Sequence, residues 1–474
     1  MTASPVRVRA ASLALAVTVA AAMVAACGSS IASPTPATSG LPATSPDAEC
    51  PGGPSAGTPG TYGGTELPEI VPTPKTVRYG EMVAMAELVC LSCPLGNLRD
   101  RLREVATEAG VAVGFEPVCD RPHSHLTIAL DATDLPPQGY RLEISQGDHG
   151  PVVEIDAGDE AGAFYGMLSL GQLMADDGGT TYVRLAEVED HPTFERRGVI
   201  LDTEQRPSAA DREKQLERLR FGVRYKLNFL AHPNATPDHS QPGAELIAYC
   251  DSHYVELISL VGYRDWLSVA PIADIKAYLK SQYDLGVRSF SLDWDDMPID
   301  DPPVVAADHA TVFAELYAYL RSLDPEIKVA ITMPPYGGVP SVNLRTGPAG
   351  ETYLGLMREK LPDDVLVFWT GNGGVFSPIV TVTGAQAYAT LVGHRVGLWD
   401  NDAIGFANER RPLSGRAADL ATVISTYMGN LAGEALWRGT DGHFALLTTL
   451  LYTWSPETYD PATAGELAEE LLVR

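Results

Sequence analysis

The sequence has few basic residues for its length. Its 474 residues include 34 Lys and Arg against 61 Asp and Glu, and the formal net charge is -27. The basic residues form no run, although binding to nucleic-acid phosphates needs a basic patch. We therefore expect no nucleic acid as a partner, and we interpret the acidity as a contribution to solubility outside a cell.

Motifs that mark several enzyme classes are also missing. No H-E-x-x-H motif or comparable histidine set is present, so a hydrolase that uses its aspartates to hold a metal is a weak alternative, and we predict neither a metal nor a cofactor. No G-x-G-x-x-G follows the first apolar run of the C-terminal part, which disfavours a dinucleotide-binding fold. Internal repeats and coiled-coil heptads are absent as well.

Cysteine is scarce, with six residues in the whole chain. Cys90 and Cys93 have C-x-x-C spacing, but the second cysteine pair or histidine pair that a zinc site needs does not accompany them. In an exported protein we expect one or two disulfides among the N-terminal cysteines, which are Cys50, Cys90, Cys93 and Cys119. Cys250 is expected to be a buried, inert thiol.

The N-terminus has the features of an export signal. Arg7 and Arg9 precede an apolar run, residues 10–26, which ends in V-A-A-C at Cys27. This pattern predicts a signal peptide over residues 1–26, and a cysteine directly after small residues resembles the bacterial lipoprotein signal. We therefore predict lipid attachment at Cys27 and a location at the outer face of a bacterial membrane, with a plain signal peptide and an incidental cysteine as the alternative. The apolar run is short for a spanning helix, so the predicted membrane contact is through lipid.

Composition and periodicity divide the rest of the chain. Residues 27–65 are dominated by Ser, Pro, Thr, Gly and Ala, which predicts a disordered tether. Residues 66–190 combine alternating strand-like runs with helical patterns and predict a small α/β accessory domain. From residue 191 to residue 474, seven clear apolar runs and a weak eighth alternate with amphipathic segments. Such alternation predicts right-handed β-α-β units and a (β/α)8 TIM barrel.

The fourth predicted barrel strand covers residues 289–294, and S-L-D-W-D-D-M-P places three aspartates at its C-terminal end: Asp293, Asp295 and Asp296. Active sites of such barrels lie at the C-terminal ends of the strands. Alternation places Asp295 and Asp296 on opposite faces unless the strand turns into its loop at Asp296, as the following Pro298 indicates. Neighbouring carboxylates in different environments can serve as acid and base. A cation-binding or helix-capping cluster is the alternative.

Aromatic and polar residues follow the other predicted strands. They are Tyr336 after the fifth, Trp369 at the sixth, Trp399, Asn401 and Asp402 at the seventh, and Asn430 farther on. Aromatic faces beside carboxylates and amides suit a sugar, because rings stack on its apolar faces and polar groups bind its hydroxyls. Trp369 is also open to a simpler interpretation, packing in the core.

With these residues in view, the sequence resembles glycoside hydrolase family 84, the β-N-acetylglucosaminidases that include O-GlcNAcases and bacterial hyaluronidase-type enzymes. The resemblance runs from about Leu67 to the end of the chain. It is carried by H-P-T-F-E-R-R-G-V-I over residues 191–200, by D-L-G-V-R-S-F-S-L-D-W-D-D over 284–296, by W-T-G over 369–371 and by L-W-D-N over 398–401. The D-D pair is the most specific of these motifs.

The resemblance implies a retaining glycosidase in which the substrate's own acetamido group attacks C1 to form an oxazoline, outside the two-carboxylate scheme. Asp295 would hold the acetamido N–H, and Asp296 would protonate the leaving oxygen and then activate water. Tyr336 would contact the acetamido group. The substrate-binding candidates are Gly198, Tyr336, Trp369, Trp399, Asn401, Asp402 and Asn430.

Three departures from the family pattern concern the sugar hydroxyls. The segment A-H-P-N-A-T-P-D over residues 231–238 lacks the family's sugar-binding lysine, and N-D-Y is missing after L-W-D-N. The first strand reads R-G-V-I-L-D-T-E-Q over residues 197–205, where the family usually has R-G-x-x-E-G-F-Y-G. Because N-D-Y is missing, the family aspartate that binds the distal hydroxyls has no clear match, and Asp402 or Asp202 would have to replace it. The competing hypothesis is therefore a catalytically weak or inactive family member that binds glycans at the cell surface.

Overall fold

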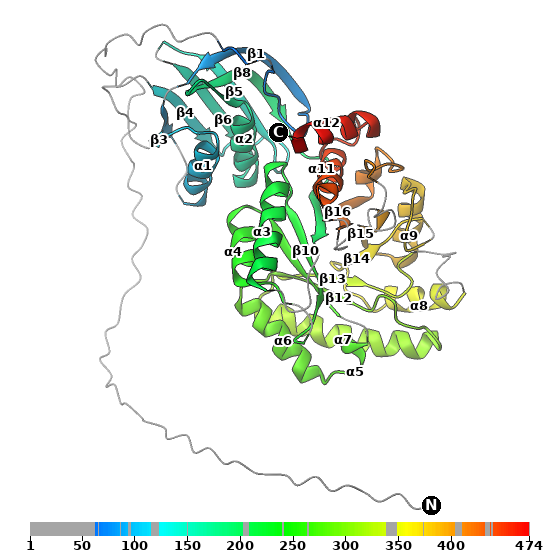
Figure 1. The fold of residues 1–474 in the computed structure, drawn as a ribbon. Coiled ribbons are helices and arrows are strands. Elements are labelled where there is room, and N and C mark those ends of the chain that lie inside the picture. The colour runs from blue at the N-terminus through cyan, green and yellow to red at the C-terminus, as the bar shows by residue number, and fades with distance from the viewer. Residues whose placement is uncertain are drawn as a thin grey trace, which may run out of the picture. The chain divides into compact units, whose positions relative to one another are not determined.

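The computed structural model (Figure 1) describes residues 62–473, except 65, 86, 93–95, 115–122, 149, 202–207, 239–240, 263–264, 338–347, 373, 403–409, 432–436 and 438. The predicted signal peptide, Cys27 and nearly all of the predicted tether lie outside these residues. No helix within the described ranges is long and apolar enough to cross a membrane.

An α/β domain precedes the barrel (Figure 1). Its strands are β1 (Thr76–Ala84), β2 (Glu87–Ser92), β3 (Val113–Gly114), β4 (His123–Ala129), β5 (Tyr140–Gln146), β6 (Pro151–Ala157), β7 (Met174–Asp177) and β8 (Thr180–Asp190). They form one mixed sheet in the order β1-β8-β5-β6-β4-β2-β3, with β7 paired to β8. Helices α1 (Asn97–Glu108) and α2 (Glu160–Gln172) belong to the same domain.

Alternating burial along β5 explains how this sheet gains a packed face. Tyr140, Leu142 and Ile144 are buried, whereas the residues between them are more exposed. A period of two is what a strand with one covered face requires. Helix α2 begins after Asp159, whose carboxylate accepts a hydrogen bond from the Gly162 N–H at 2.7 Å and satisfies one free donor of the first helical turn.

The C-terminal part is a closed parallel barrel with helices outside it (Figure 1). Its strands are β9 (Arg196–Leu201), β10 (Phe229–Ala235), β11 (Glu256–Val261), β12 (Ser289–Asp293), β13 (Lys328–Thr332), β14 (Leu366–Trp369), β15 (Arg395–Asp400) and β16 (Ile424–Leu431). The barrel closes where β16 pairs with β9. The predicted TIM barrel with a preceding α/β domain is confirmed.

Helices connect the barrel strands or follow the last of them. They are α3 (Ala209–Arg224), α4 (Ala244–Ser252), α5 (Trp266–Val269), α6 (Ile272–Asp284), α7 (Pro302–Leu323), α8 (Pro348–Arg358), α9 (Val382–Val392), the short 3-10 helix η1 (Leu420–Thr422), α11 (Asp441–Trp454) and α12 (Pro461–Val473). Right-handed β-α-β crossovers of this kind bring all strand C-termini to one end of the barrel.

The barrel interior is mostly apolar, but strand β12 is an exception. A central cluster contains Ile200, Phe229, Ala231, Ile258, Leu260, Ala330, Phe368 and Met428. On β12, Phe290 and Leu292 belong instead to the cluster packed under the helices. Strand alternation therefore turns Ser289, Ser291 and Asp293 inward. These residues make a buried polar column that leads up to the C-terminal end of the barrel.

One buried carboxylate joins the accessory domain to the barrel. Asp190, the last residue of β8, lies 3.3 Å from the Nζ of Lys226, and both side chains are fully buried. Tyr140 OH and Trp454 Nε1–H each donate a hydrogen bond to it at 2.9 Å. Segments distant in sequence therefore meet at Asp190, and burial lowers the pKa of Lys226.

Among the cysteines, the described side chains test one prediction. Cys250 is a free, buried thiol, as expected, and burial raises its pKa. The disulfide prediction concerns Cys50, Cys90, Cys93 and Cys119, whose side chains lie outside the described part of the chain.

Candidate active site

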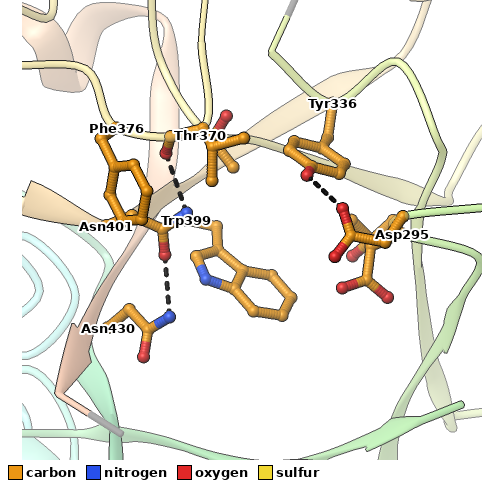
Figure 2. A pocket seen from close by; sticks show the side chains of 10 residues that line it. Asp295, Tyr336, Thr370, Phe376, Trp399, Asn401 and Asn430 are labelled. Atoms are coloured by element: carbon orange, nitrogen blue, oxygen red, sulfur yellow. Dashed lines mark hydrogen bonds between the residues drawn. The ribbon is translucent and has the colours of Figure 1, made fainter. Parts of the chain in front are cut away.

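A cavity of about 190 Å³ opens at the C-terminal end of the barrel. Its lining residues come from five consecutive strands or the segments that follow them: Asp295, Asp296, Thr332, Tyr336, Thr370, Val375, Phe376, Trp399, Asn401 and Asn430. The carboxylates face the tryptophan and the asparagines across the cavity (Figure 2). The volume is below the range of about 300–1,000 Å³ typical of drug-sized ligands, which suits recognition of a single ring.

A tight turn brings the two aspartates together. Strand β12 ends at Asp293, one residue earlier than the apolar pattern indicated, and Asp295 and Asp296 lie in the turn that follows. Asp296 has a φ of 61°, in the left-handed region that non-glycine residues rarely adopt. The turn breaks the strand alternation, so both side chains line one cavity. Such strain costs about 1–3 kcal/mol and is concentrated at functional sites.

The two carboxyls have different surroundings. Asp295 is half-buried, and burial together with the charge of Asp296 raises the pKa of Asp295 to about 6. Asp296 is more exposed, and its Oδ1 accepts a hydrogen bond from Tyr336 OH at 2.8 Å (Figure 2). The pair therefore combines a half-buried carboxyl that becomes a carboxylate above about pH 6 with one that is oriented by a tyrosine.

The opposite wall supplies hydrogen-bonding groups. The Nε1–H of Trp399 is buried and has no hydrogen-bond partner among the described residues, and an unmade bond of this kind is costly. Asn430 Nδ2 donates to Asn401 Oδ1 at 2.8 Å, and Asn401 Nδ2 donates to the Val375 carbonyl at 2.9 Å. The chain of amides fixes Asn430 beside Trp399, where both can meet a ligand (Figure 2).

An apolar rim beside this wall was missed from the sequence. Val375 and Phe376 line the cavity, and Phe376 is 52% exposed although it is a large apolar residue. The loop that carries them is fixed from within, because Thr370 Oγ1 donates to the Gly374 carbonyl at 2.7 Å. These two residues could have been predicted from their position a few residues after W-T-G, because loops that follow barrel strands line the active site.

The structure does not bring Trp369 or Gly198 to the cavity. Trp369 is 1% exposed and stacks on Tyr388 of α9 at 5.9 Å, since its position in β14 faces the helices. Gly198 pairs with Phe229 and Met428 inside the barrel, where a Cβ atom would lie 1.6 Å from the Phe229 carbonyl oxygen. The substrate-binding predictions for both are corrected to packing roles.

Asp402 is also outside the cavity lining. Its buried carboxylate accepts a hydrogen bond from Arg411 at 2.8 Å and lies 3.8 Å from Arg416. Arg416 also pairs with Asp400, the last residue of β15. Asp402 therefore belongs to a network of ion pairs and not to a set of residues that binds sugar hydroxyls. The other candidate, Asp202, lies outside the described residues. Within the described ranges, no group of three or more His, Cys, Asp or Glu is placed to hold a metal ion.

Comparisons with known proteins agree with this geometry. A β-N-acetylglucosaminidase family model matches residues 258–472, and the model for domain 2 of glycosyl hydrolase family 20 matches residues 67–191. The solved structure of CpGH84B is 19% identical, covers 85% of this chain and 74% of its own, and has a TM-score of 0.69. The chitobiase of Flavobacterium johnsoniae is 14% identical, with 85% and 72% covered and a TM-score of 0.58. An O-GlcNAc hydrolase of Thermobaculum terrenum is 20% identical, with 59% and 64% covered and a TM-score of 0.51.

At these identities the solved structures establish the fold. The fold and the family models together define a glycoside hydrolase on a TIM barrel. Within that class the chain is a β-N-acetylglucosaminidase-type glycosidase similar to glycoside hydrolase family 84, and the predicted resemblance is confirmed.

Proposed function

We propose that this protein is a retaining enzyme that cleaves β-linked N-acetylglucosamine from a glycan through an oxazoline formed by the substrate's own acetamido group. The observation that carries the proposal is the adjacency of Asp295 and Asp296 on one turn, with both carboxyls lining a cavity that suits one ring. A substrate that supplies its own nucleophile needs one group to align the amide and another to move a proton.

The mechanism assigns one role to each carboxyl. Asp295, as a carboxylate, accepts the acetamido N–H while the acetamido oxygen attacks C1. Asp296, as an acid, gives its proton to the glycosidic oxygen as the C1–O bond breaks, and then takes a proton from the water that opens the oxazoline. Tyr336, which holds Asp296 in the free site, is close enough to the pair to contact the acetamido group as well.

The opposite wall orients the ring. The indole of Trp399 offers an aromatic face, and its unmatched Nε1–H offers a donor. Asn430 is held by Asn401 and presents its amide to the same space. These residues replace part of a hydroxyl-binding set from which the family lysine is missing.

Turnover of an aryl N-acetyl-β-D-glucosaminide is the direct test, with related aryl hexosaminides tried in parallel. NMR of the first product formed should show the β anomer, because two displacements at C1 retain the configuration. A folded protein that turns over none of these substrates contradicts the proposal, and an α anomer as the first product contradicts the mechanism.

The second candidate, a glycan-binding protein without activity, is favoured by the segment that lacks lysine. His232 in this segment cannot replace the missing positive charge, because burial lowers its pKa to about 3 and keeps it neutral at physiological pH. Calorimetry with N-acetylglucosamine oligomers separates the candidates, since binding without hydrolysis favours the second.

Phe376 should contribute to substrate binding more than to the chemical step. Replacing the exposed ring in Phe376→Ala removes an apolar contact at the cavity rim, so we expect KM to rise about 3- to 10-fold with kcat changed by less than about twofold. The matched control is Ile379→Ala, because Ile379 is 61% exposed nearby but does not line the cavity. Equal effects of the two substitutions would contradict a binding role for Phe376.

We also propose that the enzyme is lipid-anchored at the outer face of a bacterial membrane, on the strength of V-A-A-C at residues 24–27. Labelling with a fatty-acid analogue should mark the wild-type protein in the membrane fraction. Cys27→Ser should lose the label and leave that fraction, whereas a label that persists in the variant would contradict attachment at Cys27.

A further inference from the structure

Asp293 lies next to the acid pair and has no part in the mechanism above. It is the last residue of β12, two positions before Asp295, and is 3% exposed. Ser291 Oγ–H donates to its Oδ1 at 2.6 Å, and Thr332, which lines the cavity, is its partner in the register of β13. A third carboxyl therefore extends the cluster from the cavity into the barrel.

This third carboxyl differs from other buried carboxylates of the described residues in its lack of a paired cation. Within the described residues, neither Asp293 nor Asp295 forms an ion pair with lysine or arginine. On the neighbouring β11 the inward residues Ile258 and Leu260 are apolar, and Glu256 lies at the start of that strand. The cations Arg196 and Lys328 lie at the opposite end of the barrel, where both are bound to Glu256. The charged group that acts on Asp293 is Asp295, which is in turn influenced by Asp296.

The contrast with the other buried aspartates is clear. In the described part of the chain these are Asp190, Asp400 and Asp402, and each lies within 4 Å of a lysine or arginine. A buried carboxylate without such a partner is costly, and the group keeps its proton instead. Asp293 therefore lacks the cationic partner that the other three buried aspartates have.

Electrostatics agree with the geometry. Burial, together with the charge of Asp295, raises the pKa of Asp293 to about 7, one step above that of Asp295 at about 6. Since these carboxyls interact, their protons belong to the cluster as a whole. The cluster therefore releases its last proton near neutral pH instead of near pH 4.

We propose that Asp293 is a positioning residue for the acid pair, a third carboxyl that retains a proton next to Asp295 and Asp296 and keeps it available to them up to neutral pH. When the proton passes to the pair, Asp293 becomes a carboxylate and one member of the pair becomes a neutral acid. The charge of the cluster does not change. The catalytic consequence rests on the proposed function, but the retained proton does not.

Asp293→Asn tests the catalytic consequence, because the amide keeps the shape of the side chain but has no carboxyl proton to pass to the pair. With an aryl N-acetyl-β-D-glucosaminide, we expect kcat/KM of the variant to fall on the alkaline side about one pH unit earlier than in the wild type, with the acidic side unchanged. Asp300→Asn, at an exposed position in the following loop, should keep the wild-type profile. If kcat/KM of Asp293→Asn falls at the same alkaline pH as in the wild type, the proposal is overturned.

Thermal unfolding across pH tests the retained proton without turnover. The pKa of Asp293 is raised in the folded state, so the folded protein keeps a proton that the unfolded chain releases near pH 4, and stability is lost as pH rises from about 4 to about 7. In Asp293→Asn part of this loss should disappear, and Tm relative to wild type should rise with pH. Ser291→Ala, which removes a hydrogen bond that favours the charged form, should carry the loss to higher pH.

The outcomes distinguish the proposed role of Asp293 from the proposed glycosidase function. Identical Tm profiles for wild type, Asp293→Asn and Ser291→Ala overturn the role of Asp293, whatever the activity. A changed profile in a protein without turnover supports the retained proton and contradicts the proposed function alone. Should Asp293→Asn fail to fold, Ser291→Ala decides the question by the same measurement.

Discussion

Asp296→Ala should lose activity in proportion to how much the leaving group needs a proton. General acid–base groups contribute about 10²- to 10⁴-fold to rate, so we expect a kcat/KM loss in this range for an N-acetylglucosamine disaccharide. The loss should be much smaller for a 4-nitrophenyl glycoside, whose leaving group departs without protonation. Steady-state kinetics on both substrates measures the difference.

The control for this substitution is Asp300→Ala, which removes an exposed carboxylate from the following loop and should leave both substrates unaffected. Equal losses on the two substrates would show that Asp296 acts by binding or by structure, because only an acid role depends on the leaving group. Unchanged activity in Asp296→Ala would remove Asp296 from the mechanism.

Of the substitutions considered, Lys226→Met should lower the free energy of unfolding the most. The substitution leaves the carboxylate of Asp190 fully buried without its cation, and breaking a buried pair on one side costs about 3–5 kcal/mol. The free energy of unfolding, from denaturant titration followed by circular dichroism, should fall by this amount. Adding Asp190→Asn to Lys226→Met should recover part of the loss, since the double variant buries no unpaired charge.

The matched control is Lys280→Met. Lys280 pairs with Asp284 on an exposed helix face at 2.6 Å, a contact of the same type in water, and exposed pairs contribute little to stability. A loss in Lys226→Met no larger than in Lys280→Met would show that the joint between the domains does not depend on this pair.

Periodicity was sufficient to predict the barrel. The eight strands follow apolar runs that alternate with amphipathic segments, and the aspartates after the fourth strand lie at the predicted end of the barrel. Tyr336 and Trp399 also reach the cavity from the strand ends that the sequence indicated, and Asn430, which was predicted only to lie farther on, reaches it from β16. Such positions are predictable because parallel strands point their C-termini the same way.

The facing of single residues was less predictable. In a strand as short as β14, an error of one residue in the predicted register assigns a side chain to the wrong face. Trp369 was expected at the cavity, but it lies on the opposite face and packs on Tyr388. The turn at Asp296 depends on a left-handed backbone that the sequence does not signal for an aspartate. Contacts such as Asp190 with Trp454 join residues 264 positions apart, beyond any local pattern.

The bond between Trp454 and Asp190 has a consequence for expression of the barrel. Helix α11 ends at Trp454 and packs on β9 and β16, the two strands that close the barrel, so this seam is supported from the other domain. A fragment cut at residue 191 would lose Asp190 and Tyr140 together, and Lys226 would have neither partner. The shorter chain would then lack the contacts that fix α11 against the β9–β16 pair. The accessory domain therefore contributes to keeping the barrel closed.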